Sequence, residues 1–393
     1  VDPNLILPFF AHLKNPRDCL QALCGKINVI RKAGLIDSSS NSRCNPERQI
    51  MTTIERYHLR RLSLTPGREL PSRLADIKEL PVILIEAETA DGTTGFADTM
   101  LIEGITPETP EQGWIIACKL AEVTAGMRCA EAAAFIANSH AVAPGATSAL
   151  RLAIENTKGG DLVTDGRHDL VAKFDPMETF PEKAQRVRLS LSGDVEADLA
   201  LIAEAQSAVS GGWLRLDGDQ AFNTEDAVRL AAALDPAGIE WLDQPCIAGD
   251  WEAAAAVKAE TNVATMVSGF LFTPQDLETA AAMSAADFVG LRLGQSGGRQ
   301  ALVEMCQISA ELALKPVLGG NLQTDLTTYF EAGAALVTEA VITDFVGPSL
   351  ALEPLLAPGL SVENERKLSL HGTPVLCGET LSLCTVQDLA FPS

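Results

Sequence analysis

Short apolar runs alternate regularly with helical patterns after Gly160, and this alternation constrains the fold more than any other feature. The apolar runs are residues 170–174, 187–191, 213–216, 239–242, 263–267, 288–293, 316–318 and 341–345. Amphipathic or alanine-rich stretches separate them from the second run onward, at 195–209, 225–233, 250–260, 274–283, 299–314 and 325–337. Strands that alternate with helices predict a parallel sheet, and eight such units predict an α/β fold of the (β/α)8-type, TIM-like barrel class.

The first link of this barrel, residues 175–186, is short and contains no clear helical pattern. An open doubly wound sheet is therefore the alternative fold. That fold usually places a glycine-rich G-x-G-x-x-G turn after its first strand. No such turn follows the first apolar run here.

The sequence on either side of the barrel region predicts an α+β capping domain. Residues 57–64 alternate in polarity, and the apolar run 81–87 leads into Asp91-Gly92, a strong signal for a β-hairpin. Alanine-rich helical stretches follow up to about residue 156. We expect an atypical N-terminal extension (1–50), a capping domain (51–160), the barrel (161–348) and a C-terminal segment that returns to the capping domain (349–393).

Charge and cysteine usage narrow the possible partners and the compartment. The 393-residue chain has a net charge of −22, which argues against nucleic acid and anionic membrane surfaces as partners. No window contains the roughly 18 consecutive apolar residues of a membrane span. The nine cysteines include no C-x-x-C pair, as expected for buried thiols in a reducing compartment. We expect a cytoplasmic protein that forms a homo-oligomer.

Two acidic residues end successive barrel strands, 26 residues apart. Asp217 and Asp243 each follow an apolar run, and the next step of 26 residues reaches Gly269. The active site of a parallel barrel lies at the C-terminal ends of its strands. Carboxylates at successive strand ends are suited to a divalent metal site, but Gly269 provides no third carboxylate.

Four segments resemble the enolase superfamily, in its mandelate racemase and muconate lactonizing branch. They are LRLDGDQAF (214–222), IEWLDQP (239–245), GLRLGQSGG (290–298) and the hairpin at 82–98. Members of this superfamily combine a Lys or His base with Mg²⁺ that stabilises an enediolate. The resemblance implies a Mg²⁺-dependent lyase, isomerase or racemase that abstracts an α-proton from a small carboxylate substrate.

Compared with this pattern, the chain keeps some catalytic positions and replaces others. By resemblance, Asp217 and Asp243 match the first two metal ligands, whereas Gly269 replaces the third. The catalytic Lys-x-Lys pair falls on Arg188 and Ser190. The opposing lysine falls on Gln295. Arginine stays protonated and cannot act as a base, and Ser or Gln is not a base without an activating partner.

Asp219 offers one compensation for the missing ligand. If the strand stays extended beyond Asp217, both side chains point the same way. Asp217, Asp219 and Asp243 would then form a three-carboxylate metal site. The alternative is that these acids are unliganded and that Asp219 is a solvated turn residue.

The basic residues and the turn at 295–298 also have two interpretations each. Arg188 and Arg292 either meet an anionic substrate or pair with acids of the barrel. The turn Gln295-Ser296-Gly297-Gly298 is either an anion-binding turn at a helix N-terminus or simply a tight loop.

Three functional hypotheses follow from these residues. The first is a divergent metal-dependent lyase, isomerase or racemase acting on a small carboxylate. The second is a catalytically inactive family member that binds a small carboxylate ligand or has an assembly role. The third is an enzyme of the same fold with chemistry that involves no enolization.

Overall fold

The computed structural model describes residues 52–67, 76–158, 163–174, 185–209, 211–320, 322–339, 341–357, 359–364 and 366–393. Thr52–Ser393 forms one compact unit. The expected N-terminal extension, residues 1–50, lies outside the described residues. Residues 175–184 of the first barrel link also lie outside them.

Eight parallel strands form the barrel sheet, and their spatial order follows the chain order. They are β5 (Ala172–Lys173), β6 (Arg186–Ser190), β7 (Trp213–Asp217), β8 (Ile239–Asp243), β9 (Thr265–Val267), β10 (Phe288–Leu291), β11 (Lys315–Leu318) and β12 (Ile342–Thr343). The backbone N–H of Val171 donates to the carbonyl of Phe345 at 2.8 Å, which joins the first and last strands. The expected (β/α)8-type architecture is therefore confirmed.

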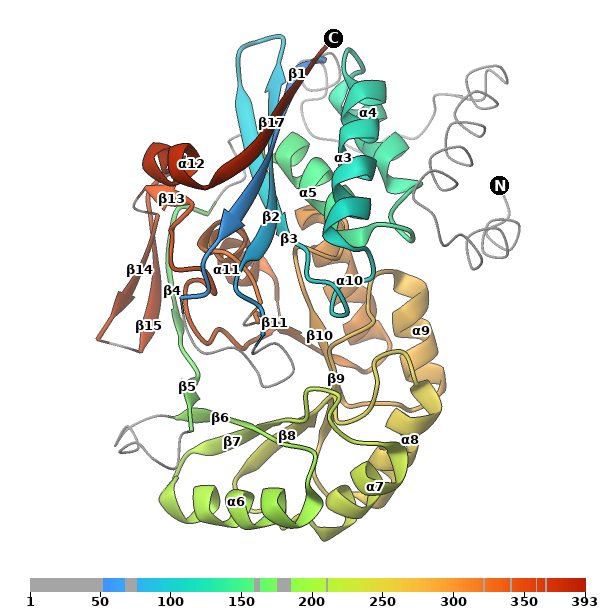
Figure 1. The fold of residues 1–393 in the computed structure, drawn as a ribbon. Helices are drawn as coiled ribbons and strands as arrows, with labels where there is room; N and C mark the ends of the chain where they lie inside the picture. The colour runs from blue at the N-terminus through green and yellow to red at the C-terminus, as the bar shows by residue number, and fades with distance from the viewer. Residues whose placement is uncertain are drawn as a thin grey trace. The chain divides into compact units, whose positions relative to one another are not determined.

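Helices connect the barrel strands and lie outside the sheet (Figure 1). They are α6 (Val195–Ala208), α7 (Thr224–Ala233), α8 (Trp251–Glu260), α9 (Pro274–Ala282), α10 (Arg299–Glu311) and α11 (Asp325–Val337). Side chains cap several of their N-termini: Asp194 accepts hydrogen bonds from two amides of α6, and Asn223 accepts one from α7. These caps explain why the helices begin close to the predicted positions.

A four-stranded antiparallel sheet forms the centre of the cap, in the order β17-β1-β2-β3. Its strands are β1 (Ile54–Leu64), β2 (Leu80–Thr89), β3 (Thr94–Met100) and β17 (Thr385–Pro392). Helices α3 (Pro110–Thr124), α4 (Cys129–Ala137) and α5 (Pro144–Asn156) flank this sheet (Figure 1). The hairpin turns at Asp91-Gly92, where Gly92 has a φ of 79° that glycine adopts without strain. The last strand of the chain thus pairs with the first strand of the cap.

The remaining C-terminal elements are small. A three-stranded sheet joins β14 (Leu360–Glu363), β15 (Lys367–His371) and β4 (Asp165–Asp169), and β13 (Leu356–Ala357) pairs with β16 (Val375–Leu376). Helix α12 (Gly378–Cys384) leads into β17.

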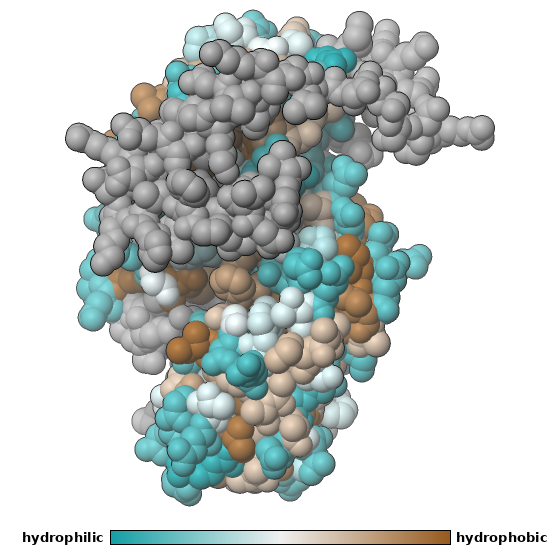
Figure 2. Space-filling view, turned by 90° about the vertical axis from the view of Figure 1, so that its right-hand side faces the viewer, coloured by the Kyte–Doolittle hydropathy of each residue, from teal (hydrophilic) through white to brown (hydrophobic). Residues whose placement is uncertain are grey.

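Cap and barrel share one hydrophobic core, in which Leu84 and Leu150 of the cap cluster with Leu291 and Phe330 of the barrel. On the coloured part of the face in Figure 2, hydrophobic residues lie among hydrophilic ones rather than in one continuous apolar band. Within the part of the chain that the structure describes, no helix has both the length and the apolar character needed to cross a bilayer.

Candidate functional site

The C-terminal strand ends of the barrel bring together the acids that were 26 residues apart in sequence. Asp217 is the last residue of β7 and pairs in register with Asp243, the last residue of β8. Ser190, at the end of β6, pairs in register with Asp217. The regular spacing therefore places the two carboxylates side by side at the mouth of the barrel.

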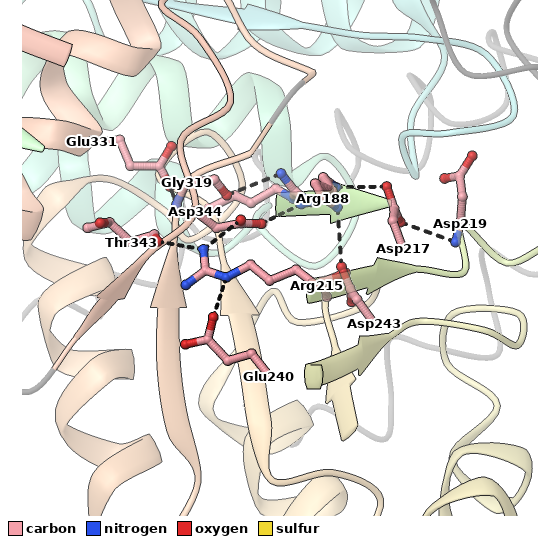
Figure 3. A network of polar contacts seen from close by, with 12 residues as sticks. Arg188, Arg215, Asp217, Asp219, Glu240, Asp243, Gly319, Glu331, Thr343 and Asp344 are labelled. Carbon is pink, nitrogen blue, oxygen red and sulfur yellow. Dashed lines mark hydrogen bonds and ion pairs between the residues drawn. The ribbon is translucent and has the colours of Figure 1, made fainter. Parts of the chain in front are cut away.

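Arg188 lies at the centre of these strand ends, where it contacts three carboxylates (Figure 3). Its Nε donates to Asp217 Oδ2 at 2.9 Å, and its Nη2 lies 3.4 Å from Asp243 Oδ2. Its Nη1 donates to Asp344 Oδ2. The side chain is almost fully buried. Of the two interpretations of Arg188, pairing with barrel acids is confirmed.

Arg215 forms a second cationic layer on the other side of Asp344 (Figure 3). Its Nη1 donates to Asp344 Oδ1 at 2.8 Å and to the carbonyl of Thr343 at 2.9 Å. Its Nε donates to Glu240 Oε2 at 2.7 Å, and its guanidinium lies 4.0 Å from the ring centre of Trp241. Arg215 was not among the residues expected at the site, although its position two residues before Asp217 on one strand places both side chains on the same face.

Burial and charge act in opposite directions on the central groups. Burial alone would lower the pKa of Arg188, but Asp217, Asp344 and Asp243 outweigh it and raise that pKa further. Burial raises the pKa of Asp243 well above its ordinary value, although Arg188 partly offsets this effect. The network is thus held together by an arginine that is permanently protonated.

The remaining oxygens of Asp217 and Asp243 are also engaged by the protein. Asp217 Oδ1 accepts from the backbone N–H of Asp219 at 3.2 Å, and the Ser268 hydroxyl donates to Asp243 Oδ1 at 2.7 Å. With the contacts of Arg188, each of the four carboxylate oxygens has a partner. The structure therefore accounts for both acids without a metal ion.

Asp219 does not lie where an extended strand would have placed it. Strand β7 ends at Asp217, and Asp219 and Gln220 have φ angles of 42° and 61°, in the left-handed region. The Asp219 side chain nevertheless lies beside Asp217 on the wall of the same cavity (Figure 3). The condition of an extended strand beyond Asp217 is not met, because the chain turns immediately after Asp217, and Asp219 as a metal ligand stays a prediction.

Gly269 is closely packed as well as lacking a ligand atom. Its backbone N–H donates to Gln244 Oε1 at 3.1 Å, and a Cβ at this position would lie 2.4 Å from the Cβ of Ala248. A carboxylate side chain at position 269 would therefore require Ala248 to move.

Taken together, these residues do not fit a divalent ion. The Arg188 guanidinium lies between Asp217 and Asp243, the oxygens of both acids already have partners in the protein, and Gly269 provides no side-chain oxygen. Among the described residues, no group of three or more His, Cys, Asp or Glu side chains is arranged to hold a metal ion. The Mg²⁺ site expected from the resemblance remains a prediction that this geometry does not favour.

A cavity of about 290 Å³ opens beside this network. Met100 at the end of β3 and Ile102 and Ile105 of the following cap loop form one wall, and the barrel strand ends form the other. Arg292 and Gln295 line the cavity, as do Arg188 and the acids Asp217, Asp219 and Asp243. Ser190 is exposed and is not among the described lining residues.

Arg292 has a different environment from Arg188. Its Nη1 donates to the carbonyl of Gly319 at a long 3.4 Å, and the described residues include no acid within ion-pair distance of it. Glu331, fully buried on α11, lies nearby; burial raises the pKa of its carboxyl, and Arg292 partly offsets this rise. Glu331 Oε1 instead accepts from the backbone N–H groups of Gly319 and Leu293, at 3.2 and 3.4 Å. Arg292 is thus a partly buried cation on the cavity wall with spare hydrogen-bonding capacity.

The turn at residues 295–298 holds an anion that belongs to the protein itself. Glu155 of α5 accepts from the backbone N–H of Arg299, the first residue of α10, at 2.7 Å. A Cβ at Gly298 would lie 2.7 Å from Glu155 Oε1, so the carboxylate packs directly against this turn. The N-terminus of α10 therefore binds a cap-domain side chain.

Comparison with known proteins agrees with this architecture. Residues 173–371 match the family model described as enolase C-terminal domain-like. Muconate cycloisomerase 1 of Acinetobacter baylyi is 29% identical over 168 residues, which cover 42% of this chain and 44% of that protein. The chain spans about half the length of the first curated relatives that it matches.

Solved structures extend the likeness to the whole fold. N-succinyl Arg/Lys racemase from Bacillus cereus superposes with a TM-score of 0.77 at 17% identity, covering 86% of this chain and 99% of that chain. A dipeptide epimerase from Cytophaga hutchinsonii, solved with Mg and the dipeptide D-Ala-L-Val, superposes with a TM-score of 0.75 at 16% identity, covering 86% and 100%. Since the family model covers slightly more than half of the 393 residues, the chain belongs to the enolase superfamily, in its mandelate racemase and muconate lactonizing branch.

Proposed function

We propose that the barrel mouth binds a small carboxylate, that Arg292 anchors its anionic group, and that binding requires no divalent ion. The observation that carries this proposal is the environment of Arg292. It lines the cavity, and among the described residues its side chain makes one long hydrogen bond, to the Gly319 carbonyl. An arginine in this state can form a bidentate pair with an incoming carboxylate.

The size and lining of the cavity support a small ligand with an apolar or amide body. A volume of about 290 Å³ is at the lower end of the range for ligand pockets. Ile102, Ile105, Phe270 and Phe272 provide apolar surface, whereas Gln295 provides an amide close to Arg292. Dipeptides, N-succinyl amino acids and muconate, named for the relatives, are the first ligands to test.

The described cavity wall argues against the proton abstraction that the resemblance implies. It contains no Lys, His or Cys side chain. Arg188 is held by three acids, and Gln295 is not a base without an activating partner. The buried histidines His140 and His168 bond to the backbone carbonyls of Phe272 and Ala332 and are not among the described lining residues. We therefore favour the binding protein over the α-proton-abstracting enzyme.

The magnesium-dependent lyase, isomerase or racemase is the second candidate, and one observation favours it. Asp217 and Asp243 remain neighbours at successive strand ends, in register with each other. The relatives include epimerases, racemases and cycloisomerases. This candidate requires Mg²⁺, whereas the proposed binding protein does not. Experiments with and without Mg²⁺ therefore separate the two candidates.

Calorimetry with the three ligand classes, in buffer with EDTA and in buffer with Mg²⁺, tests the proposal. We expect binding in both buffers and a loss of at least about tenfold in affinity for Arg292→Gln, since one charge-assisted pair contributes roughly 1.5–3 kcal/mol. Arg229→Gln is the matched control, because Arg229 is exposed on α7 and pairs only with the nearby Asp226 among the described residues. Equal binding by wild type and Arg292→Gln would contradict Arg292 as the anchor.

Incubation of the same ligands in D₂O, followed by mass spectrometry, tests the second candidate. Exchange of the α-proton that depends on Mg²⁺ would identify an enzyme and overturn the binding-protein proposal.

We further propose a homo-oligomer in the cytoplasm, which light scattering and cell fractionation can test.

A further inference from the structure

Four strands meet around one cation at the mouth of the barrel. Asp217 ends β7, Asp243 ends β8, and Asp344 follows β12, whereas the guanidinium at their centre comes from Arg188 on β6 (Figure 3). Arg188 makes an ion pair with each of the three acids. All four side chains are buried, so water compensates their charges little.

Three buried carboxylates at neighbouring positions repel one another unless a cation lies between them. A divalent ion is one solution, and it requires oxygen ligands at 2.0–2.1 Å, as for Mg²⁺. A guanidinium is another, because its planar donors can reach several carboxylates and its charge does not depend on pH. We propose that Arg188 is a built-in replacement for a divalent cation, and that this exchange makes the barrel mouth independent of metal.

Because Arg215 also binds Asp344, the proposed exchange of a divalent cation for a guanidinium concerns the Arg188 side chain alone. It holds Asp344 Oδ1 and Glu240 on the inner side of the network, while Arg188 holds Asp344 Oδ2 on the outer side. Loss of Arg188 would therefore leave Asp344 fastened by Arg215. Asp217 and Asp243 would lose their only ion-pair partner among the described residues.

The inference predicts that removing Arg188 creates a divalent-cation site. With Mn²⁺ as the probe, we expect the full-length Arg188→Ala variant to bind at millimolar concentration, seen as loss of the free Mn²⁺ signal in electron paramagnetic resonance. Bound Mn²⁺ should also raise the unfolding midpoint by roughly 2 °C or more. The wild type should show neither effect.

Three further variants show whether the new site is the one proposed. Arg188→Lys keeps a positive charge among the acids and should not bind Mn²⁺. Arg188→Ala combined with Asp217→Asn should lose the binding that Arg188→Ala gains. Arg186→Ala removes an arginine from the same strand that pairs with Glu240 and should bind no Mn²⁺.

Each outcome decides the proposal. Folding of Arg188→Ala only when Mn²⁺ is present would support it as directly as binding to an already folded variant. Equal Mn²⁺ binding by wild type and Arg188→Ala would overturn it. A variant that stays unfolded in both conditions would also overturn it, because the ion would then not replace the guanidinium. The result does not depend on which ligand Arg292 binds, so it is separate from the calorimetric test.

Discussion

At the scale of single residues, Gly269 stands where the resemblance implies a third carboxylate, and its neighbours leave no room for one. The space that a side chain at position 269 would need is taken by Ala248, whose Cβ would lie 2.4 Å from a new Cβ. The hydroxyl of Ser268, the residue before Gly269, donates a hydrogen bond to Asp243. The close approach of Ala248 to position 269 and the central position of Arg188 are thus parts of one arrangement of the strand ends.

Replacing Gly269 tests this coupling by stability alone. Gly269→Ala should lower the free energy of unfolding by about 1–3 kcal/mol, the usual cost of overpacking. In an Ala248→Gly background, the same substitution should cost much less, because the Cβ that it meets is gone. Urea unfolding of the four proteins measures the difference. An equal cost in both backgrounds would show that the contact with Ala248 is not the cause.

At the scale of elements, the sequence predicted the barrel well because most of its strands are buried over much of their length. Such strands appear as continuous apolar runs, and all eight expected runs overlap an observed strand. Helix α11 occupies the expected range. What the sequence did not reveal depends on contacts distant along the chain, such as Arg215 with Asp344, or on backbone torsion, such as the turn at Asp219. Residue type and spacing indicate neither.

Strand β3 and helix α11 are joined by a buried acid, and this junction should depend on pH. The hydroxyls of Thr324 and Thr327 donate to Asp98 at 2.8 and 2.9 Å. Burial raises the pKa of Asp98 from 3.8 to about 7, although these hydroxyls partly oppose the shift. The folded state therefore holds a proton that the unfolded chain releases at lower pH. Stability should fall as pH rises from about 4 to about 7 and change little above that range.

Asp98→Asn should make this fall less steep and raise stability at pH 8 by up to a few kcal/mol, because no charge is then buried at position 98. Urea unfolding at several pH values measures the slope. Glu204→Gln is a control, since it neutralises an exposed carboxylate on α6 and should leave the slope unchanged. A slope that is unchanged in Asp98→Asn would assign the pH dependence to other groups.

At the scale of the whole unit Thr52–Ser393, cap and barrel depend on each other through contacts between distant segments. Strand β17 pairs along β1, so the cap sheet depends on a segment that follows the barrel in the chain. Glu155 of the cap holds the first turn of α10, and Asp98 of the cap holds the first turn of α11. Both helices flank the segments that carry Arg292 and Gln295. The cavity is thus shaped by elements that should unfold together.

Glu155→Ala tests this cooperativity. The substitution removes the acceptor at the N-terminus of α10, and it should cost about 0.5–2 kcal/mol by analogy with the loss of a helix cap. If cap and barrel form one cooperative unit, hydrogen exchange in native buffer with low urea should show this loss equally in the slowest amides of β1–β3 and of β6–β8. The control Glu122→Ala removes an exposed glutamate of α3 that pairs with Lys119 and should leave both sets unchanged. Loss of protection confined to α10 would mean that the cap and the barrel open independently.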